Sequence, residues 1–216
     1  PAENTSLVDI FERNFQKYGS RDAFIFMDKV LTFNELEVAS RKFATYLQSL
    51  NLAKGTRVAV MMPNVFQYPV VALGIFRAGL VLVNVNPLYT ARELDHQLND
   101  SGAEVLVIIE NFASVYQTIV GKTPVKHVVV ASVGDMLGTL KGTLVNFVLR
   151  KVRKQIPAWN IPGYTKFNAA LNSVNQSDYK RPSLTLSDSA VLQYTGGTTG
   201  VSKGAELTHG NLVANL

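Results

Sequence analysis

The chain has 216 residues, a formal net charge of +5, and 47% hydrophobic against 17% charged residues. This balance excludes a disordered chain and leaves room for one large domain or two small ones. The absence of cysteine excludes a disulfide framework and a thiolate metal site, and it favours a cytoplasmic protein.

The first predicted elements are two helices separated by a small hairpin. Residues 1–5 carry no basic region followed by an apolar run, so we expect no signal peptide. Apolar spacing predicts a helix over 6–18. Residues 23–32 are typical of a hairpin that turns at Asp28-Lys29. The second helix runs from 34 to about 50, and Thr32-x-x-Glu35 in front of it matches a capping box.

Beyond residue 56, short apolar strands alternate with helices. The predicted order is strand 57–61, helix 63–79, strand 80–85, helix 90–101, strand 105–109, helix 112–120 and strand 127–131. Continuously apolar strands separated by helices are typical of a parallel sheet that is buried on both faces. We therefore predict an α/β fold with a mostly parallel sheet flanked by helices on both faces. No membrane span is expected, because the longest apolar run is broken by Arg77 and Gly79.

The alternation lapses between residues 132 and 186, and this segment carries the whole positive excess. Six basic residues and no acid lie between Met136 and Ser177, all six within 136–166, whereas the rest of the chain has 15 basic against 16 acidic residues. An apolar helical stripe there ends in a basic cluster. Two interpretations stay open: a solvated helix end whose cations suit the helix dipole, or a peripheral helix on an anionic membrane surface. Nucleic acid is not expected, because aromatic residues are not interleaved with the charges.

A glycine-rich loop close to the C-terminal end is the strongest candidate site. Residues 194–204 read YTGGTTGVSKG, between an apolar run at 190–192 and an extended segment at 205–208. Glycines let successive N–H groups form an anion-binding concavity, to which threonine hydroxyls and one lysine add donors and charge. The pattern indicates a polyphosphate site between two strands, and a plain hairpin tip is the alternative. A Walker A loop is excluded, because Lys203 lies between Ser202 and Gly204.

The same loop carries a family resemblance. The stretch YTGGTTGVSKGAELTH (194–209) closely resembles the nucleotide-phosphate motif of the adenylate-forming superfamily, and it differs at Ser202, where proline is usual. The tyrosine start and the upstream segment NPLYTAREL (86–94) are similar to the bacterial long-chain-fatty-acid–CoA ligase branch. The resemblance runs along nearly the whole chain. It implies an acyl-adenylate formed from ATP with Mg²⁺ bridging the phosphates, followed by a coenzyme A thioester.

The resemblance implies a nucleotide-binding set, with no catalytic and no metal-ligating residue in this chain. The phosphates of ATP would be held by Thr195, Gly196, Gly197, Thr198, Thr199, Gly200 and Lys203. His96, His127 and His209 are too scattered for a zinc site. We interpret His127 as structural, Tyr194 as a core residue or loop anchor, and His209 as structural rather than in contact with a ligand.

Family members continue well past Leu216, so we predict that residues 1–216 are the N-terminal part of the large domain and complete neither half-reaction alone. Within them we expect an α/β subdomain (1–131), a basic excursion (132–186), and the phosphate loop with its flanking strands (187–216). The resemblance implies a long-chain fatty acid, ATP and coenzyme A as substrates, a homodimer, and a cytoplasmic protein that is peripheral on the inner membrane. A non-catalytic binding or assembly module with the same fold is the alternative.

Overall fold

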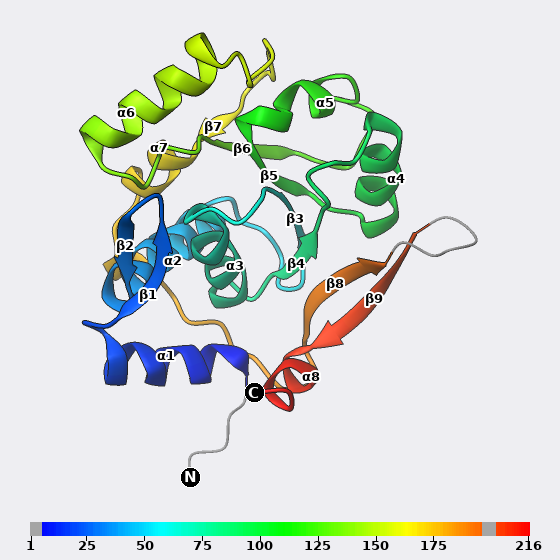
Figure 1. The fold of residues 1–216 in the computed structure, drawn as a ribbon. Helices are drawn as coiled ribbons and strands as arrows, with labels where there is room; N and C mark the ends of the chain where they lie inside the picture. The colour runs from blue at the N-terminus through cyan, green and yellow to red at the C-terminus, as the bar shows by residue number, and fades with distance from the viewer. Residues whose placement is uncertain (1–5, 196–201) are drawn as a thin grey trace.

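The computed structural model describes residues 6–195 and 202–216 and has one main sheet (Figure 1). Within those residues the sheet has seven strands in the order β7-β6-β5-β3-β4-β8-β9. The strands are β3 (Arg57–Met61), β4 (Val81–Asn84), β5 (Val105–Ile109), β6 (His127–Ala131), β7 (Thr165–Lys166), β8 (Ser189–Thr195) and β9 (Lys203–Thr208). Neighbouring strands are parallel throughout, except that β9 runs antiparallel to β8. The predicted mostly parallel sheet is therefore confirmed.

Helices cover both faces of this sheet, as predicted. One face carries α1 (Leu7–Tyr18), α2 (Phe33–Ser49), α3 (Gln67–Arg77) and α7 (Phe167–Asn172), and the other carries α4 (Ala91–Ser101) and α5 (Ala113–Gln117). Successive strand residues point to opposite faces, so each strand supplies both cores. In β3, for example, Val58 and Val60 belong to the α2–α3 core, whereas Ala59 and Met61 belong to the α4–α5 core. This explains why the strands are apolar without alternation.

Local hydrogen bonds set several of the predicted boundaries. Thr32 caps α2, because its Oγ1 accepts from the N–H of Glu35 at 3.2 Å while the Glu35 carboxylate accepts from the N–H of Thr32 at 2.8 Å. The predicted hairpin is present as β1 (Asp22–Phe26) and β2 (Lys29–Thr32). Its two turn residues are Met27 and Asp28, both with positive φ, so the turn lies one position before the predicted one.

Two expectations need correction. Helix α3 begins at Gln67 rather than at Pro63, because the chain turns first: Val65 N donates to Pro63 O at 2.9 Å, and Tyr68 N then donates to Val65 O at 3.0 Å. Periodicity predicts no strand between residues 132 and 186, but β7 extends the sheet there by pairing with β6. A strand of two residues is too short to show a period.

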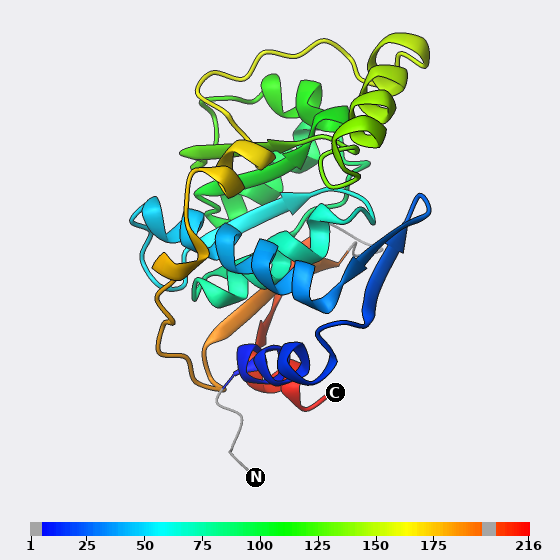
Figure 2. The same cartoon turned by 90° about the vertical axis from the view of Figure 1, so that its left-hand side faces the viewer.

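The other helical segments are short. Helix α6 (Thr139–Phe147) continues into a π-helical segment, η2 (Val148–Val152), and short 3-10 helices form at η1 (Glu110–Phe112) and η3 (Gln176–Asp178). Helix α8 (His209–Val213) lies beside α1, at the end of the molecule opposite α6 (Figures 1 and 2). In the part of the chain that the structure describes, no helix is both long and apolar enough to cross a bilayer.

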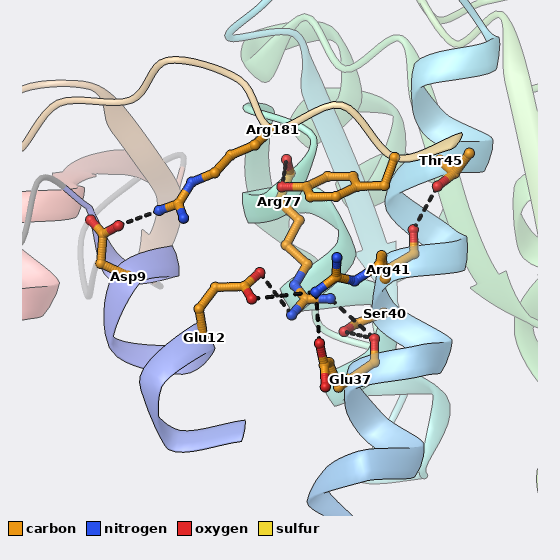
Figure 3. A network of polar contacts seen from close by, with 9 residues as sticks. Asp9, Glu12, Glu37, Ser40, Arg41, Thr45, Arg77 and Arg181 are labelled. Carbon is orange, nitrogen blue, oxygen red and sulfur yellow. Dashed lines mark hydrogen bonds and ion pairs between the residues drawn. The ribbon is translucent and has the colours of Figure 1, made fainter. Parts of the chain in front are cut away.

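A buried ion-pair network joins α1, α2 and α3 (Figure 3). Arg77, which is only 1% exposed, pairs with the Glu12 carboxylate at 3.0 Å and donates to the carbonyl of Glu37 at 3.1 Å. Arg41 lies on the same cluster, 2.6 Å from Glu37 and 3.4 Å from Glu12. Tyr179, on the segment that leads to β8, donates its hydroxyl to the carbonyl of Arg77 at 3.0 Å. The network therefore ties the first three helices to the chain that enters the candidate site.

Candidate functional site

The candidate site is a crevice at the carboxyl ends of β3, β4 and β8. The chain leaves β3 for α3 on one face and leaves β4 for α4 on the other face, so the ends of these neighbouring strands separate. Ligands of open α/β sheets bind in crevices of this kind. The crevice has a volume of about 290 Å³ and is lined by Val60, Met62, Asn64, Tyr68, Asn84, Val85, Asn86, Tyr89, Gln193 and Tyr194.

Neutral polar side chains form the floor of the crevice. The Tyr68 hydroxyl donates to Asn84 Oδ1 at 2.8 Å, and Asn84 Nδ2 donates to Gln193 Oε1 at 3.0 Å. From the other face, Gln97 Nε2 donates to the Asn84 carbonyl at 2.7 Å. Burial raises the pKa of Tyr68, so its hydroxyl stays protonated and keeps its donor role. The floor of the crevice therefore offers hydrogen bonds to a ligand and carries no charged side chain.

Tyr194 anchors the base of the glycine-rich loop. Its ring is buried and its hydroxyl donates to the Asp100 carboxylate at 2.5 Å, which ties β8 to α4. Burial, reinforced by Asp100, raises the pKa of this phenol and keeps it protonated. The ring lies against Gly204, its partner across the β8–β9 pair, so closely that a Cβ there would be 2.9 Å from Tyr194 Cε2. The structure thus gives Tyr194 the anchoring role.

Two of the seven predicted phosphate-binding residues are described, and they lie opposite each other. Thr195 ends β8, Lys203 begins β9, and the two residues pair across the strands at the base of the loop. Both are exposed, so the hydroxyl and the ammonium are accessible to an anion. Gly196, Gly197, Thr198, Thr199 and Gly200 lie outside the described residues.

A larger hollow lies at the opposite ends of the same strands and is not the better candidate. It measures about 440 Å³ and is bordered by Arg57, Val81 and Ser189, which begin β3, β4 and β8. Its lysine, Lys54, is already paired with Asp188 at 2.8 Å. Ligands bind at the carboxyl ends of parallel strands rather than at their amino ends, so we place the site at the smaller crevice.

The structure places His209 away from the glycine-rich loop. His209 lies at the far end of β9 from Lys203, where its Nδ1 accepts the N–H of Leu7 at 3.3 Å and its ring meets Phe76 edge-on at 6.0 Å. Burial lowers the pKa of His209, so the imidazole stays neutral and structural. Among residues 6–195 and 202–216, no three His, Cys, Asp or Glu side chains are placed to hold a metal ion.

Sequence reasoning missed the residues on the crevice floor. Asn84 and Gln193 are separated by 109 positions and meet only because β4 and β8 are neighbours in the sheet. The signal that could have revealed them is a polar residue at the end of an otherwise apolar strand. Asn84 follows Val81–Val83, and Gln193 follows Ala190–Leu192.

Known proteins resemble this chain in sequence and in fold. The sequence model of one family, described as AMP-binding enzyme, matches residues 11–216. A long-chain-fatty-acid–CoA ligase of Escherichia coli O157:H7 is 53% identical over the whole chain, and one of Bacillus subtilis (strain 168) is 33% identical. The chain spans 39% and 38% of these two relatives' own lengths.

Solved structures give the same picture. A long-chain-fatty-acid-CoA ligase from Archaeoglobus fulgidus matches 99% of this chain and 38% of its own, with a TM-score of 0.77 and 27% identity. An anthranilate CoA ligase in complex with anthranoyl-AMP matches 97% of this chain and 35% of its own, with a TM-score of 0.78. Its identity is 22%, so this second likeness shows the fold alone.

Proposed function

The chain belongs to the family of AMP-binding enzymes, and from that membership we propose that it is the N-terminal part of a long-chain fatty acid–CoA ligase. The observation that carries the proposal is the match along the whole chain to relatives named long-chain-fatty-acid–CoA ligases. The position of the glycine-rich loop, which follows β8 at the carboxyl edge of the sheet, supports it.

The proposed reaction has two steps. A fatty acid carboxylate attacks the α-phosphate of ATP and releases pyrophosphate, and the thiol of coenzyme A then displaces AMP from the acyl-adenylate. The first step brings a carboxylate to a polyanion, so the main physical need is neutralisation of negative charge. No residue of the loop acts as a nucleophile in either step.

In this reaction the loop holds the β- and γ-phosphates. Lys203 supplies one mobile positive charge and Thr195 one hydroxyl, from opposite sides of the loop base. Tyr194 and Asp100 hold that base against α4. Thr198, Thr199 and the loop glycines, outside the described residues, complete the proposed set. Among the described residues no group of three His, Cys, Asp or Glu side chains could hold a metal ion, so Mg²⁺ would be bound mainly through the phosphates of ATP.

Calorimetric titration of the purified chain with ATP tests the nucleotide assignment. We expect Lys203→Ala to weaken binding roughly tenfold to a hundredfold, because a hydrogen bond to a charged group contributes about 1.5–3 kcal/mol. Lys122→Ala, which removes an exposed lysine elsewhere, is the matched control and should bind like the unmodified chain. Equal affinity of the Lys203→Ala variant and the control would refute the assignment.

We also propose that residues 1–216 alone complete neither half-reaction, since they span 39% of the length of the relative from Escherichia coli. Pyrophosphate release from ATP in the presence of oleate tests this. Turnover by the purified chain would overturn the proposal. A non-catalytic assembly module with the same fold is the alternative. It predicts that calorimetry detects no heat of ATP binding, either for the unmodified chain or for Lys203→Ala.

Two further expectations concern location and assembly. We propose that the basic segment 136–166 contacts an anionic membrane surface, so that a cytoplasmic protein is peripheral on the inner membrane. A solvated helix end is the alternative for this segment. We propose a homodimer, which sedimentation equilibrium would test; a monomer at every concentration would refute it.

A further inference from the structure

The outer side of α6 and η2 carries a row of apolar side chains that nothing in the described structure covers. Leu140, Leu144, Phe147 and Val152 are between 55% and 89% exposed. Three of them, Leu140, Leu144 and Phe147, follow at intervals of four and three, so they lie on one side of the helix. An ordinary surface helix buries such a row and exposes its polar side.

The orientation of α6 is held by its inner side. A Cβ at Gly142 would lie 2.2 Å from the carbonyl oxygen of Gly134, so the two backbones are in close contact. Asn146 Oδ1 accepts the N–H of Gly134 at 2.8 Å. At the end of the helix, Arg150 pairs with the buried Glu110 carboxylate at 2.8 Å. These contacts leave the apolar row facing outwards.

The hairpin of β1 and β2 extends this apolar surface. Lys29 Nζ donates to the carbonyl of Met136 at 2.9 Å, and Lys141 Nζ donates to the carbonyl of Met27, so the turn is tied to the start of α6. Ile25 is 70% exposed and Met27 43%. In both Figure 1 and Figure 2, α6 and the hairpin tip project from the same side of the molecule. We define the α6–hairpin surface by Ile25, Met27, Leu140, Leu144, Phe147 and Val152.

The charge at the η2 end of this surface has one sign. Lys151, Arg153 and Lys154 are exposed, and within the described residues no acid pairs with them. The sequence has no Asp or Glu from Met136 to Ser177. A second copy of the chain on the same surface would bring these cations against each other. A surface of anionic phosphates would neutralise them.

We propose that the α6–hairpin surface is a lipid-binding face that lies on an anionic bilayer. The apolar row enters the boundary between headgroups and acyl chains, while Lys151, Arg153 and Lys154 contact lipid phosphates. This proposal depends on the proposed function only to explain why the protein would bind a bilayer, because a fatty acid substrate partitions into the bilayer. It goes further by naming the residues and the orientation.

The orientation also places the crevice close to the lipid. An apolar groove of about 450 Å³ lies between the hairpin and the start of α3, with Phe24, Ile25 and Phe26 on its hairpin side. Asn64 and Tyr68 line this groove and also the crevice at the carboxyl edge of the sheet. An alkyl chain that leaves a bilayer at the hairpin would therefore follow apolar side chains along the groove and meet Asn64 and Tyr68 where the groove borders the crevice.

Co-sedimentation with vesicles tests the face. The purified chain is mixed with vesicles of phosphatidylcholine alone or with phosphatidylglycerol added. We expect binding only to the anionic vesicles, and weaker binding at high salt. The double variant Leu140→Asp, Leu144→Asp should lose binding, whereas Leu186→Asp, an exposed leucine beside α8 at the other end of the molecule, should keep it. Circular dichroism checks that each variant is folded.

A second pair of variants tests the charge. Lys151→Gln with Lys154→Gln should weaken binding roughly fivefold for each lysine removed. Lys122→Gln with Lys180→Gln removes the same charge from other exposed positions and should leave binding unchanged. Binding that survives the leucine variants, or equal binding to neutral vesicles, would overturn the proposal. So would a dimer that Leu140→Asp, Leu144→Asp converts to a monomer, because the surface would then be a protein interface.

The outcomes separate this inference from the proposed function. A chain that binds ATP but neither type of vesicle refutes the lipid-binding face and leaves the nucleotide assignment intact. If the chain binds anionic vesicles through α6 but calorimetry detects no binding of ATP, the lipid-binding face is supported and the nucleotide assignment is refuted.

Discussion

Replacing Arg77 by alanine tests whether the buried ion-pair network holds the first three helices together. Arg77 is 1% exposed and pairs with Glu12 at 3.0 Å. It donates to the Glu37 carbonyl at 3.1 Å, and its guanidinium lies 5.0 Å from the centre of the Phe15 ring. The truncation removes all three contacts at once and leaves a void between α1, α2 and α3.

The expected loss follows from this burial. Removing one partner of a buried ion pair costs about 3–5 kcal/mol of unfolding free energy. We expect the lower end of this range, about 3 kcal/mol. Glu12 still has Arg41 as a partner at 3.4 Å, and the Glu12 side chain is 19% exposed, so water can partly solvate its charge. With a urea dependence of about 2–3 kcal/mol/M, the midpoint of denaturation should fall by about 1 M. Urea titration followed by circular dichroism measures it.

A surface pair in the same region provides the control. Arg181 contacts Asp9, and about half of the arginine side chain is exposed (Figure 3). Arg181→Ala should therefore cost less than about 1 kcal/mol. If Arg77→Ala lowers the midpoint no more than Arg181→Ala does, burial does not set the strength of this network and the reasoning is wrong.

Three other changes probe packing, pH and the loop base. Gly74→Ala should cost about 1–3 kcal/mol, because its Cβ would lie 2.8 Å from Phe43 Cδ1 where α2 meets α3; an unchanged urea midpoint would contradict this. Burial lowers the pKa of His209, so the unfolded chain binds more protons there in acid. Stability should therefore fall as the pH drops below about 6.5, and His209→Gln should flatten that fall in thermal melts; an equally steep fall would count against it. Gly204→Ala should weaken ATP binding in calorimetry while the circular dichroism spectrum is unchanged, because its Cβ would press on Tyr194 at 2.9 Å. Undiminished affinity would mean that the loop base tolerates the shift.

Up to residue 131, the sequence by itself determined the order of the main strands and helices and many of their ends. Strands β3, β5 and β6 have the predicted bounds, because continuous apolar runs between glycine and polar residues mark a buried strand. The helix ends at Thr32 and Thr90 were predictable for a related reason. Each capping hydroxyl bonds the N–H three positions later, so the whole interaction lies within one short stretch of sequence. The glycine-rich loop, which we propose holds phosphate, stood out by its composition for the same reason.

The tertiary structure alone decided which distant residues meet. Strand order brought Asn84 to Gln193, and helix packing buried Arg77, which the sequence shows only as a charge that breaks an apolar run. The apolar stripe on α6 was visible in the sequence, but its side chains face outwards only because Gly142 and Asn146 lie against Gly134. A periodic pattern shows that a helix has an apolar side and does not show what lies against it. That depends on the packing of segments far apart in the chain, whose contacts leave no local period.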